Sequence, residues 1–255
     1  MITNHVHELP VRLNTIVQLV TKAGCVADIG SDHGQVPLAL LEQGRVERAI
    51  AVEVARGPFV MAETAFRKSQ YHGQLEARFG DGLHPLQKGE VQGIVIAGMG
   101  AGTIWHILTA SYALRLLSDD LPELIVQPME ETGLIRFFAR LTGYKVKQDV
   151  WIQDRGLIYN CLQLHPPDNF EFADFDNALA MFHQMPWSER LELEYGMALY
   201  DSHDIIFNEY LTLQVRKTRY ILAQLEQSRS VSAQEQRIRL NDYLWVLEKI
   251  RLSHH

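Results

Sequence analysis

The sequence has few cysteines, no long apolar run and no excess of positive charge. Only two of its 255 residues are cysteines, Cys25 and Cys161. They are too few for a disulfide framework and too far apart for a zinc site, and both fall in expected strands. No stretch approaches the roughly 18 apolar residues that span a bilayer, and no basic segment followed by an apolar core opens the chain. A soluble, cytoplasmic protein without a structural metal is therefore expected.

The net charge of −7 argues against a generally basic nucleic-acid binder. The charge is nevertheless uneven: it is −2 over residues 1–165, −9 over 166–210 and +4 over 211–255. Because salt limits the reach of exposed charges to about 10 Å, a basic final segment can present a local cationic patch whatever the total. The hydrophobic content of 47% is ample for a core.

The first two-thirds of the sequence alternates between short apolar runs and amphipathic stretches, which indicates a mostly parallel sheet covered by helices on both faces. Only Asp154, Arg155 and Gly156 join the last two runs, so these form an antiparallel hairpin. Five crossover-linked strands and a closing hairpin are typical of an α/β, Rossmann-like class I methyltransferase with a seven-stranded sheet. The expected strands are 25–29, 48–52, 75–80, 93–98, 123–128, 144–153 and 156–165.

After residue 165 the sequence has almost no strand pattern, and three helical stretches are expected instead. Ser232 and Glu235 form a candidate capping box for the last of them. The short connection between the last two predicts an antiparallel helical hairpin, similar to a short coiled coil. We therefore expect a sheet domain over residues 1–167 and a helical domain over 168–255. The expected helices are 175–199, 204–228 and 233–252.

Ligands of doubly wound sheets bind beyond the carboxyl ends of the strands, so the residues that end each strand are informative. The loop after the first strand, residues 28–33, has one glycine and two carboxylates, and would repel a pyrophosphate. Glu53 ends the second strand 25 positions after Asp28, close to the spacing at which a carboxylate meets ribose hydroxyls. The third and fourth strands end in Gly80-Asp81-Gly82 and Gly98-Met99-Gly100.

The residue types in these loops fit a cationic adenosine compound. Asp28 and Asp32 favour a sulfonium or an ammonium group. Glu53 can accept hydrogen bonds from both ribose hydroxyls, and Asp81 can accept one from an adenine amino group. The loops therefore indicate S-adenosylmethionine, rather than a dinucleotide, as the cofactor.

Four motifs now stand in order along the chain: "ADIGSDH" at 27–33 followed by Pro37, "GDGL" at 80–83, "IAGMG" at 96–100 and "QP" at 127–128. With them, the sequence resembles the bacterial tRNA adenine-22 N1-methyltransferases over nearly its whole length. The resemblance implies a class I methyltransferase domain, a helical, coiled-coil-like tRNA-binding domain and methylation of adenine N1 in the D-arm region. The sequence differs from the family at Gly34-Gln35, Ala101 and Met129, where Ala-Tyr, a third glycine and Asn are common.

The resemblance also implies roles for single residues. Adenine N1 has an available lone pair and can attack a sulfonium methyl directly, so little acid–base apparatus is needed. His33 either assists by hydrogen bonding or is a structural loop residue. The implied cofactor-binding residues are Asp28, Gly30, Ser31, Asp32, His33, Glu53, Asp81, Gly82, Gly98, Met99 and Gly100. The implied catalytic residues are His33, Gly98, Met99, Gln127 and Pro128.

Basic residues in two places are candidates for contacts with RNA. Arg12 matches an Arg-Leu pair that the family carries near its N-terminus, and it either contacts RNA phosphate or the target pocket, or is an ordinary surface residue. Arg216, Lys217 and Arg219 fall together in the basic final segment, where they neutralise phosphates or form a solvated face. The expected partner is tRNA, and no metal, membrane or obligate protein partner is expected.

Two alternative functions stay open from the sequence. An enzyme of the same fold that acts on another RNA or on a small molecule would share the cofactor loops. A catalytically decayed S-adenosylmethionine-binding interaction protein would account for Met129, and its helical hairpin would recruit a partner.

Overall fold

The computed structural model describes residues 9–110, 113, 121–168, 170–171, 173–227 and 230–253. The seven predicted strands are confirmed to within two residues at either end. They are β1 (Ala23–Ile29), β2 (Val46–Glu53), β3 (Leu75–Phe79), β4 (Gly93–Met99), β5 (Glu123–Pro128), β6 (Lys145–Asp154) and β7 (Leu157–His165). The helices are α1 (Val11–Leu19), α2 (Gln35–Glu42), α3 (Arg56–Lys68), α4 (Ala101–Thr109), α6 (Thr132–Thr142), α7 (Phe175–Gln184), α8 (Trp187–Tyr195), η1 (a 3₁₀ helix, Gly196–Tyr200), α9 (Ile205–Leu225) and α10 (Val231–Ser253).

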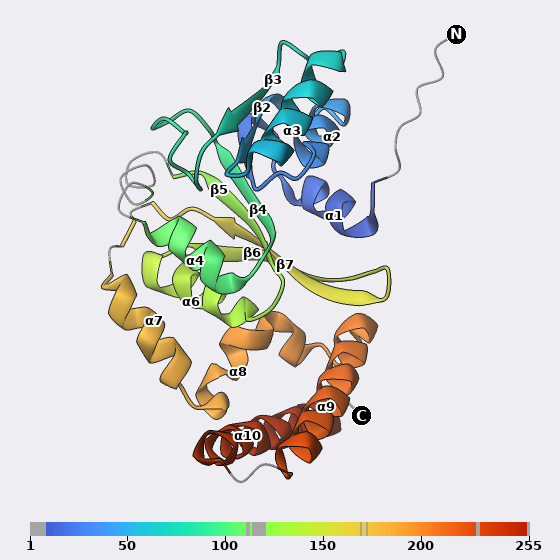
Figure 1. The fold of residues 1–255 in the computed structure, drawn as a ribbon, viewed down its shortest axis with the longest axis vertical. Helices are drawn as coiled ribbons and strands as arrows, with labels where there is room; N and C mark the ends of the chain where they lie inside the picture. Colours follow the sequence, from blue (N-terminus) through green and yellow to red (C-terminus); the bar gives the residue numbers. More distant parts are fainter. Residues whose placement is uncertain are drawn as a thin grey trace.

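All seven strands form one sheet in the order β3-β2-β1-β4-β5-β7-β6 (Figure 1). The first five strands are parallel to one another, and β7 runs antiparallel to both β5 and β6. The predicted closing hairpin is thus confirmed. The consequence for function is that β1 to β5 all end at one edge of the sheet, and that the β6–β7 turn lies at that same edge because β6 runs parallel to β5.

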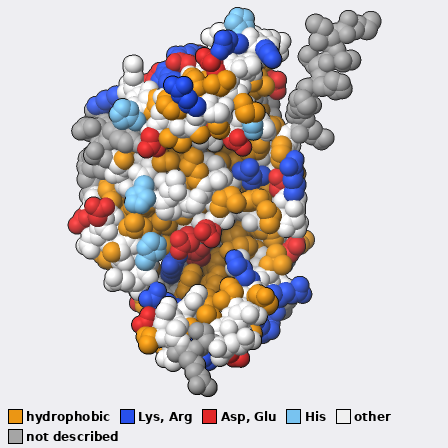
Figure 2. Space-filling model, in the orientation of Figure 1, with side chains coloured by type: hydrophobic (Ala, Val, Ile, Leu, Met, Phe, Trp, Pro, Cys, Tyr) orange, Lys and Arg blue, Asp and Glu red, His pale blue; other side chains and the backbone are white. Residues whose placement is uncertain are grey.

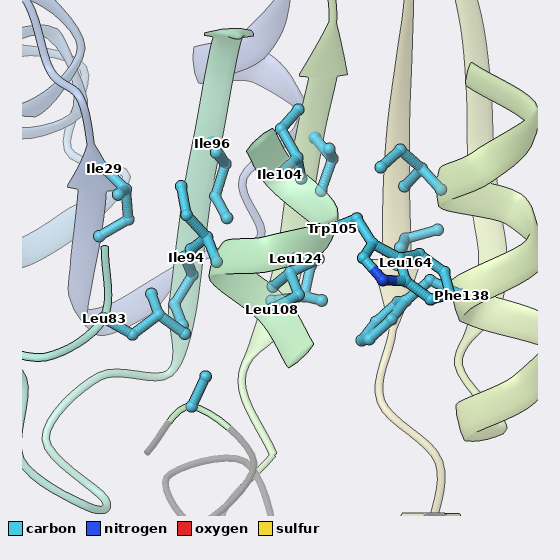
Figure 3. Packing of buried hydrophobic residues seen from close by; sticks show 14 of the residues in the cluster. Ile29, Leu83, Ile94, Ile96, Ile104, Trp105, Leu108, Leu124, Phe138 and Leu164 are labelled. Carbon is cyan, nitrogen blue, oxygen red and sulfur yellow. The ribbon is translucent and has the colours of Figure 1, made fainter. Parts of the chain in front are cut away.

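The sheet is buried on both faces, which explains why its central strands read as continuous apolar runs. One cluster of buried side chains joins α1, α2 and α3 to one face. Another joins α4, α6 and α7 to the opposite face. Figure 3 shows part of the second cluster, in which Trp105 of α4 lies close to Leu124 and Leu164 of the sheet and to Phe138 of α6. These two layers hold the carboxyl edge of the sheet rigid.

The helical region differs from its prediction at two places. The single helix expected over 175–199 is wrong, because α7 ends before Met185 and α8 begins after Pro186. A proline has no N–H to continue the ladder and restricts the residue before it to extended conformations. The capping box of Ser232 and Glu235 is also wrong: Ser230 caps α10, with its Oγ accepting a hydrogen bond from Ala233 N at 3.1 Å.

Helices α9 and α10 follow one another and pack together, while the predicted antiparallel, coiled-coil-like geometry stays a prediction. A third cluster of buried side chains holds them together, with Phe207, Leu211 and Val215 of α9 against Val246 and Leu247 of α10. The same cluster contains Trp151 of β6, whose ring centroid lies 5.1 Å from that of Phe207. The helical hairpin therefore docks directly on the β6–β7 hairpin.

The division of the chain into two domains at residue 167 stays a prediction. Two aromatic side chains of α7, Phe175 and Phe182, belong to the same cluster as Trp105 and Phe138 of the sheet domain. The first helix after the predicted boundary thus shares the sheet's core. A boundary drawn by packing would fall later in the chain.

A buried ion pair also joins the sheet to the helices that follow it. Arg136 of α6 is 5% exposed and donates from Nη2 to both carboxylate oxygens of Asp149 on β6, at 2.9 Å each. Its Nη1 donates to the carbonyl oxygens of Leu193 and Glu194 in α8, at 2.8 Å each. A guanidinium has enough donors to hold three elements at once.

Within the described ranges, no helix has the length and apolarity needed to cross a bilayer, and no group of three or more His, Cys, Asp or Glu side chains is placed to hold a metal ion. Both cysteines are buried in strands, Cys25 in β1 and Cys161 in β7.

Candidate active site

A cavity of about 380 Å³ opens beyond the carboxyl ends of β1 and β4. Its walls come from the loop after β1, the end of β4, the start of α1 and the β6–β7 turn. Such cavities at the edge of a doubly wound sheet are the usual ligand sites of this architecture. The lining residues are Pro10, Arg12, Leu13, Asp28, Gly30, Ser31, Asp32, Gln35, Val36, Ala97, Gly98, Met99 and Arg155.

The loop after β1 turns sharply through left-handed backbone conformations. Gly30 has a φ of 69°, and Asp32, His33 and Gly34 follow with φ values of 37°, 71° and 69°. A Cβ at Gly30 would lie 2.2 Å from Cε of Met99, so a side chain here would displace the end of Met99 and would also be strained by the left-handed φ. The glycine lets the β1 and β4 loops meet directly over the cavity.

Asp28 is the buried carboxylate of the site. Its residue is 3% exposed, and its Oδ2 atom makes no hydrogen bond within the described structure. Burial raises the pKa of Asp28 to about 7, the nearby Glu53 carboxylate adds to the rise, and the Ser31 hydroxyl and Arg12 oppose it. A buried acceptor without a partner is costly, and a cationic ligand in the cavity would relieve that cost.

Glu53 ends β2 next to the same loop. It is 5% exposed, and its Oε1 accepts a hydrogen bond of 2.5 Å from the backbone N–H of Asp32. Burial raises the pKa of Glu53, while the hydrogen bond from Asp32 lowers it. Glu53 thus fixes the loop that carries Asp32, and it lies beside the cavity rather than in its lining.

A β-bulge shapes the end of β4. The register with β5 shifts between Ala97, which pairs with Gln127, and Met99, which pairs with Pro128. Gly98, between them, has a φ of 75° and faces the cavity. The bulge leaves the Met99 carbonyl to accept a hydrogen bond from Met129 N at 2.8 Å. The backbone around Gly98 is therefore open to an incoming molecule.

Arg12 reaches into the site from α1. Its Nη1 donates to Oε1 of Gln127 at 2.7 Å, and its guanidinium lies over the Tyr159 ring at 5.4 Å from the centroid. Gln127 itself is fully buried. The structure thus places Arg12 in the cavity wall, with its Nη1 3.7 Å from where a Cβ at Gly98 would be. Whether Arg12 contacts RNA stays a prediction.

Other predicted residues lie outside the cavity lining. The His33 side chain is 44% exposed and its Nε2 lies 3.2 Å from Oδ1 of Asp32. Asp81 follows β3 and is exposed. It lies at the same sheet edge as Glu53, since the preceding residue, Gly80, donates its backbone N–H to the Glu53 carbonyl at 2.9 Å. Gly82, Gly100 and Pro128 are near the edge but not in the lining.

The predicted basic cluster on α9 does not meet the cavity. Arg216, Lys217 and Arg219 are all exposed. Arg219 forms an ion pair of 2.6 Å with Glu248 of α10, which neutralises part of the cluster's charge. The cluster's part in RNA binding stays a prediction.

Sequence reasoning missed several residues of the cavity. Pro10 and Leu13 flank Arg12, and Gln35 and Val36 follow the predicted loop, so all four stood within three residues of a candidate. Arg155 had no such signal. It lies in the turn of a hairpin whose length and direction had to be known before its side chain could be placed at the sheet edge.

The sheet order with its antiparallel closing hairpin, and the acidic cavity beyond β1 and β4, define a methyltransferase of the Rossmann-like class. The chain belongs to this family, because a family model described as a methyltransferase domain matches residues 9–162.

Relatives of known activity or structure resemble the chain over nearly its whole length. A tRNA (adenine(22)-N(1))-methyltransferase from Bacillus subtilis is 29% identical over 248 residues, which are 95% of this chain and 97% of the relative. The crystal structure of the B. subtilis m1A22 tRNA methyltransferase superposes with a TM-score of 0.76 at 27% identity, covering 96% of this chain and 99% of the other. A Streptococcus pneumoniae protein crystallised with S-adenosyl-L-methionine has a TM-score of 0.69 at 22% identity, with coverages of 94% and 98%.

Proposed function

We propose that the protein transfers a methyl group from S-adenosylmethionine to N1 of adenine 22 in tRNA. One observation carries the proposal: the chain matches the B. subtilis enzyme of that activity over 95% of its own length and 97% of the enzyme's, helical region included. A match confined to the sheet would support only the cofactor and the reaction type. The helical region is where related folds with other substrates are expected to differ.

The cavity suits S-adenosylmethionine by its chemistry. Its buried floor offers the Oδ2 atom of Asp28, an acceptor that has no hydrogen-bond partner in the described structure. Asp32 adds a second carboxylate to the lining. A ligand with a sulfonium and an ammonium group supplies the positive charge that this floor lacks. Glu53 and Asp81, further along the same edge, are then the acceptors for the ribose and the adenine.

The chemistry requires positioning more than proton transfer. When bound, S-adenosylmethionine supplies an electrophilic methyl group, which adenine N1 attacks with its lone pair as the thioether leaves. Gly98 has no side chain to obstruct the base, and the bulge holds its backbone open. The carboxylates of the site stabilise the positive charge that develops on the methylated ring. Because N1 lies on the pairing edge, the adenine must be unstacked to reach this position.

Adenine-specific methylation is tested with defined RNA. The protein is incubated with methyl-labelled S-adenosylmethionine and a tRNA transcript, and the nucleosides are separated by mass spectrometry. The proposal requires label in 1-methyladenosine. A transcript with guanine at position 22 is the matched control and must lose the label. Label in a different nucleoside would indicate another RNA target, and bound cofactor without transfer would indicate a binding protein.

A further inference from the structure

The β6–β7 turn brings a second arginine to the mouth of the candidate active site. Arg155 lines the cavity together with Arg12, although they are far apart in the sequence. In Figure 1 the hairpin extends beyond the sheet, with α1 on one side of its tip and α9 on the other. The tip therefore contributes to the cavity wall from the side between α1 and α9.

The backbone at this position is unfavourable for arginine. Arg155 has a φ of 50° and Gly156 one of 78°, the pattern of a two-residue type I′ hairpin turn. Gly is favoured at such a first turn position because it has no Cβ, and Asn and Asp are favoured because their short polar side chains form local hydrogen bonds, whereas other side chains are strained there. An arginine at a strained position next to a cavity suggests a use for its guanidinium.

The guanidinium of Arg155 is also uncompensated. The residue is exposed and forms no hydrogen bond or ion pair with any of the residues that the structure describes. Arg12, by contrast, is engaged by Gln127 and Tyr159. Arg155 thus has all five of its donors free for an external acceptor, in the fork geometry that matches phosphate oxygens.

Acidic and basic side chains lie at different depths in this cavity. The buried interior holds the carboxyl group of Asp28, whereas the more exposed lining holds the two cations Arg12 and Arg155 together with one carboxylate, Asp32. A cationic cofactor and an anionic nucleotide would therefore find complementary charge at different depths. On the face shown in Figure 2, Lys and Arg side chains are scattered rather than gathered into one field.

The hairpin that carries Arg155 is held firmly. Trp151, on the same strand, packs against Phe207 and Tyr210 of α9 at centroid distances of 5.1 and 4.7 Å. Gln153, two residues before the turn, donates from Nε2 to the carboxylate of Glu209 at 3.0 and 3.1 Å. The helical hairpin thereby fixes the position of the turn.

We propose that Arg155 binds a backbone phosphate of the target nucleotide and so positions the unstacked adenine over Gly98. The inference rests on the proposed function, since it requires an RNA substrate. It makes Arg155 a positioning residue, because Arg155 lies on the β6–β7 turn, while the proposed transfer takes place at the β4 bulge.

The test uses three variants of the full-length protein. Arg155→Asn removes the charge and substitutes a residue that tolerates the left-handed turn, so folding is preserved or improved. Arg155→Lys keeps the charge without the planar fork. Lys147→Asn removes the same charge from an exposed position near the amino end of β6, whereas Arg155 follows the carboxyl end of that strand, and it is the matched control.

For Arg155→Asn, we expect unchanged S-adenosylmethionine affinity and a KM for tRNA at least about tenfold higher, as for loss of a charged hydrogen bond. The slope of log affinity against log salt should become shallower by about 0.7–0.9, one phosphate contact. Arg155→Lys should keep the salt slope and recover only part of the KM. Lys147→Asn should match the wild type in both.

Two results would overturn the inference. One is a KM and a salt slope in Arg155→Asn within twofold of the wild type. The other is an equal loss in Lys147→Asn, which would mean that overall charge, not position, matters. A wild-type protein that binds S-adenosylmethionine but methylates no tRNA would instead overturn the proposed function, and the same assay series distinguishes this case.

Discussion

Replacing Asp28 with Asn should stabilise the ligand-free protein at alkaline pH while weakening cofactor binding. Asp28 is 3% exposed, and burial raises its pKa from 3.8 to about 7. Because the pKa is higher in the folded state, the contribution of this group to stability is fully present below pH 3.8 and is lost as the pH rises through 7. Asparagine has the same shape and does not ionise, so its contribution does not change with pH.

The size of the effect follows from the shift. At about 1.4 kcal/mol per pKa unit, the whole loss is about 4 kcal/mol, of which about 2.5 kcal/mol falls between about pH 5 and about pH 8.5. For a chain of this length, that difference corresponds to a change of about 5–10 °C in Tm. The stability of Asp28→Asn relative to the wild type should increase by this amount over that pH interval.

The assay is urea or thermal unfolding of both proteins without cofactor at several pH values. Asp32→Asn is the control, since it makes the same chemical change in the same loop at a carboxylate whose side chain is 78% exposed. A stability difference between Asp28→Asn and the wild type that stays flat over the interval would refute the assignment of Asp28 as a buried, destabilising carboxylate.

Binding should show the opposite preference. Ionised Asp28 attracts a cationic ligand, so the wild type should bind S-adenosylmethionine more weakly as the pH falls below about 7. Asp28→Asn should bind weakly at every pH. Calorimetry that found equal affinities in the two proteins would separate the unfavourable burial of Asp28 from any role in binding.

Three further predictions concern the neighbouring loops and the helical junction. Glu53→Ala should weaken S-adenosylmethionine binding by about 1.5–3 kcal/mol in calorimetry, and unchanged affinity would remove Glu53 from the cofactor site. Gly98→Ala should lower kcat more than cofactor affinity, because φ is 75° at Gly98 and a side chain strains the bulge. Gly100→Ala should be tolerated, because a Cβ there meets nothing within 4 Å; equal losses of kcat in the two variants would contradict the role of the bulge. Arg136→Ala should cost about 3–5 kcal/mol of unfolding free energy in urea, because the buried Asp149 keeps its hydrogen bond from Asn160 but loses the cation that pairs with it, and a loss below about 1 kcal/mol would argue against that pairing.

Local patterns in the sequence were sufficient for the sheet. The central strands are buried on both faces, so each one appears as a short apolar run whose ends can be located without knowledge of its neighbours. The parallel order then places Asp28, Glu53 and Gly98 at one edge, because each ends or nearly ends its strand. The break between α7 and α8 was also a local signal, Pro186, but the helical pattern on either side of it obscured the boundary.

Only the tertiary structure decided how side chains from separate elements converge. The hydrogen bond from Arg12 to Gln127 joins residues 115 positions apart. The raised pKa of Asp28 results mainly from its burial by the segments that pack around it. Arg155 could be placed only when the direction of β6 and the docking of Trp151 on α9 were known. Strand and helix patterns arise from neighbours a few residues away, whereas burial and charge at a site depend on contacts between distant segments, which no local pattern encodes.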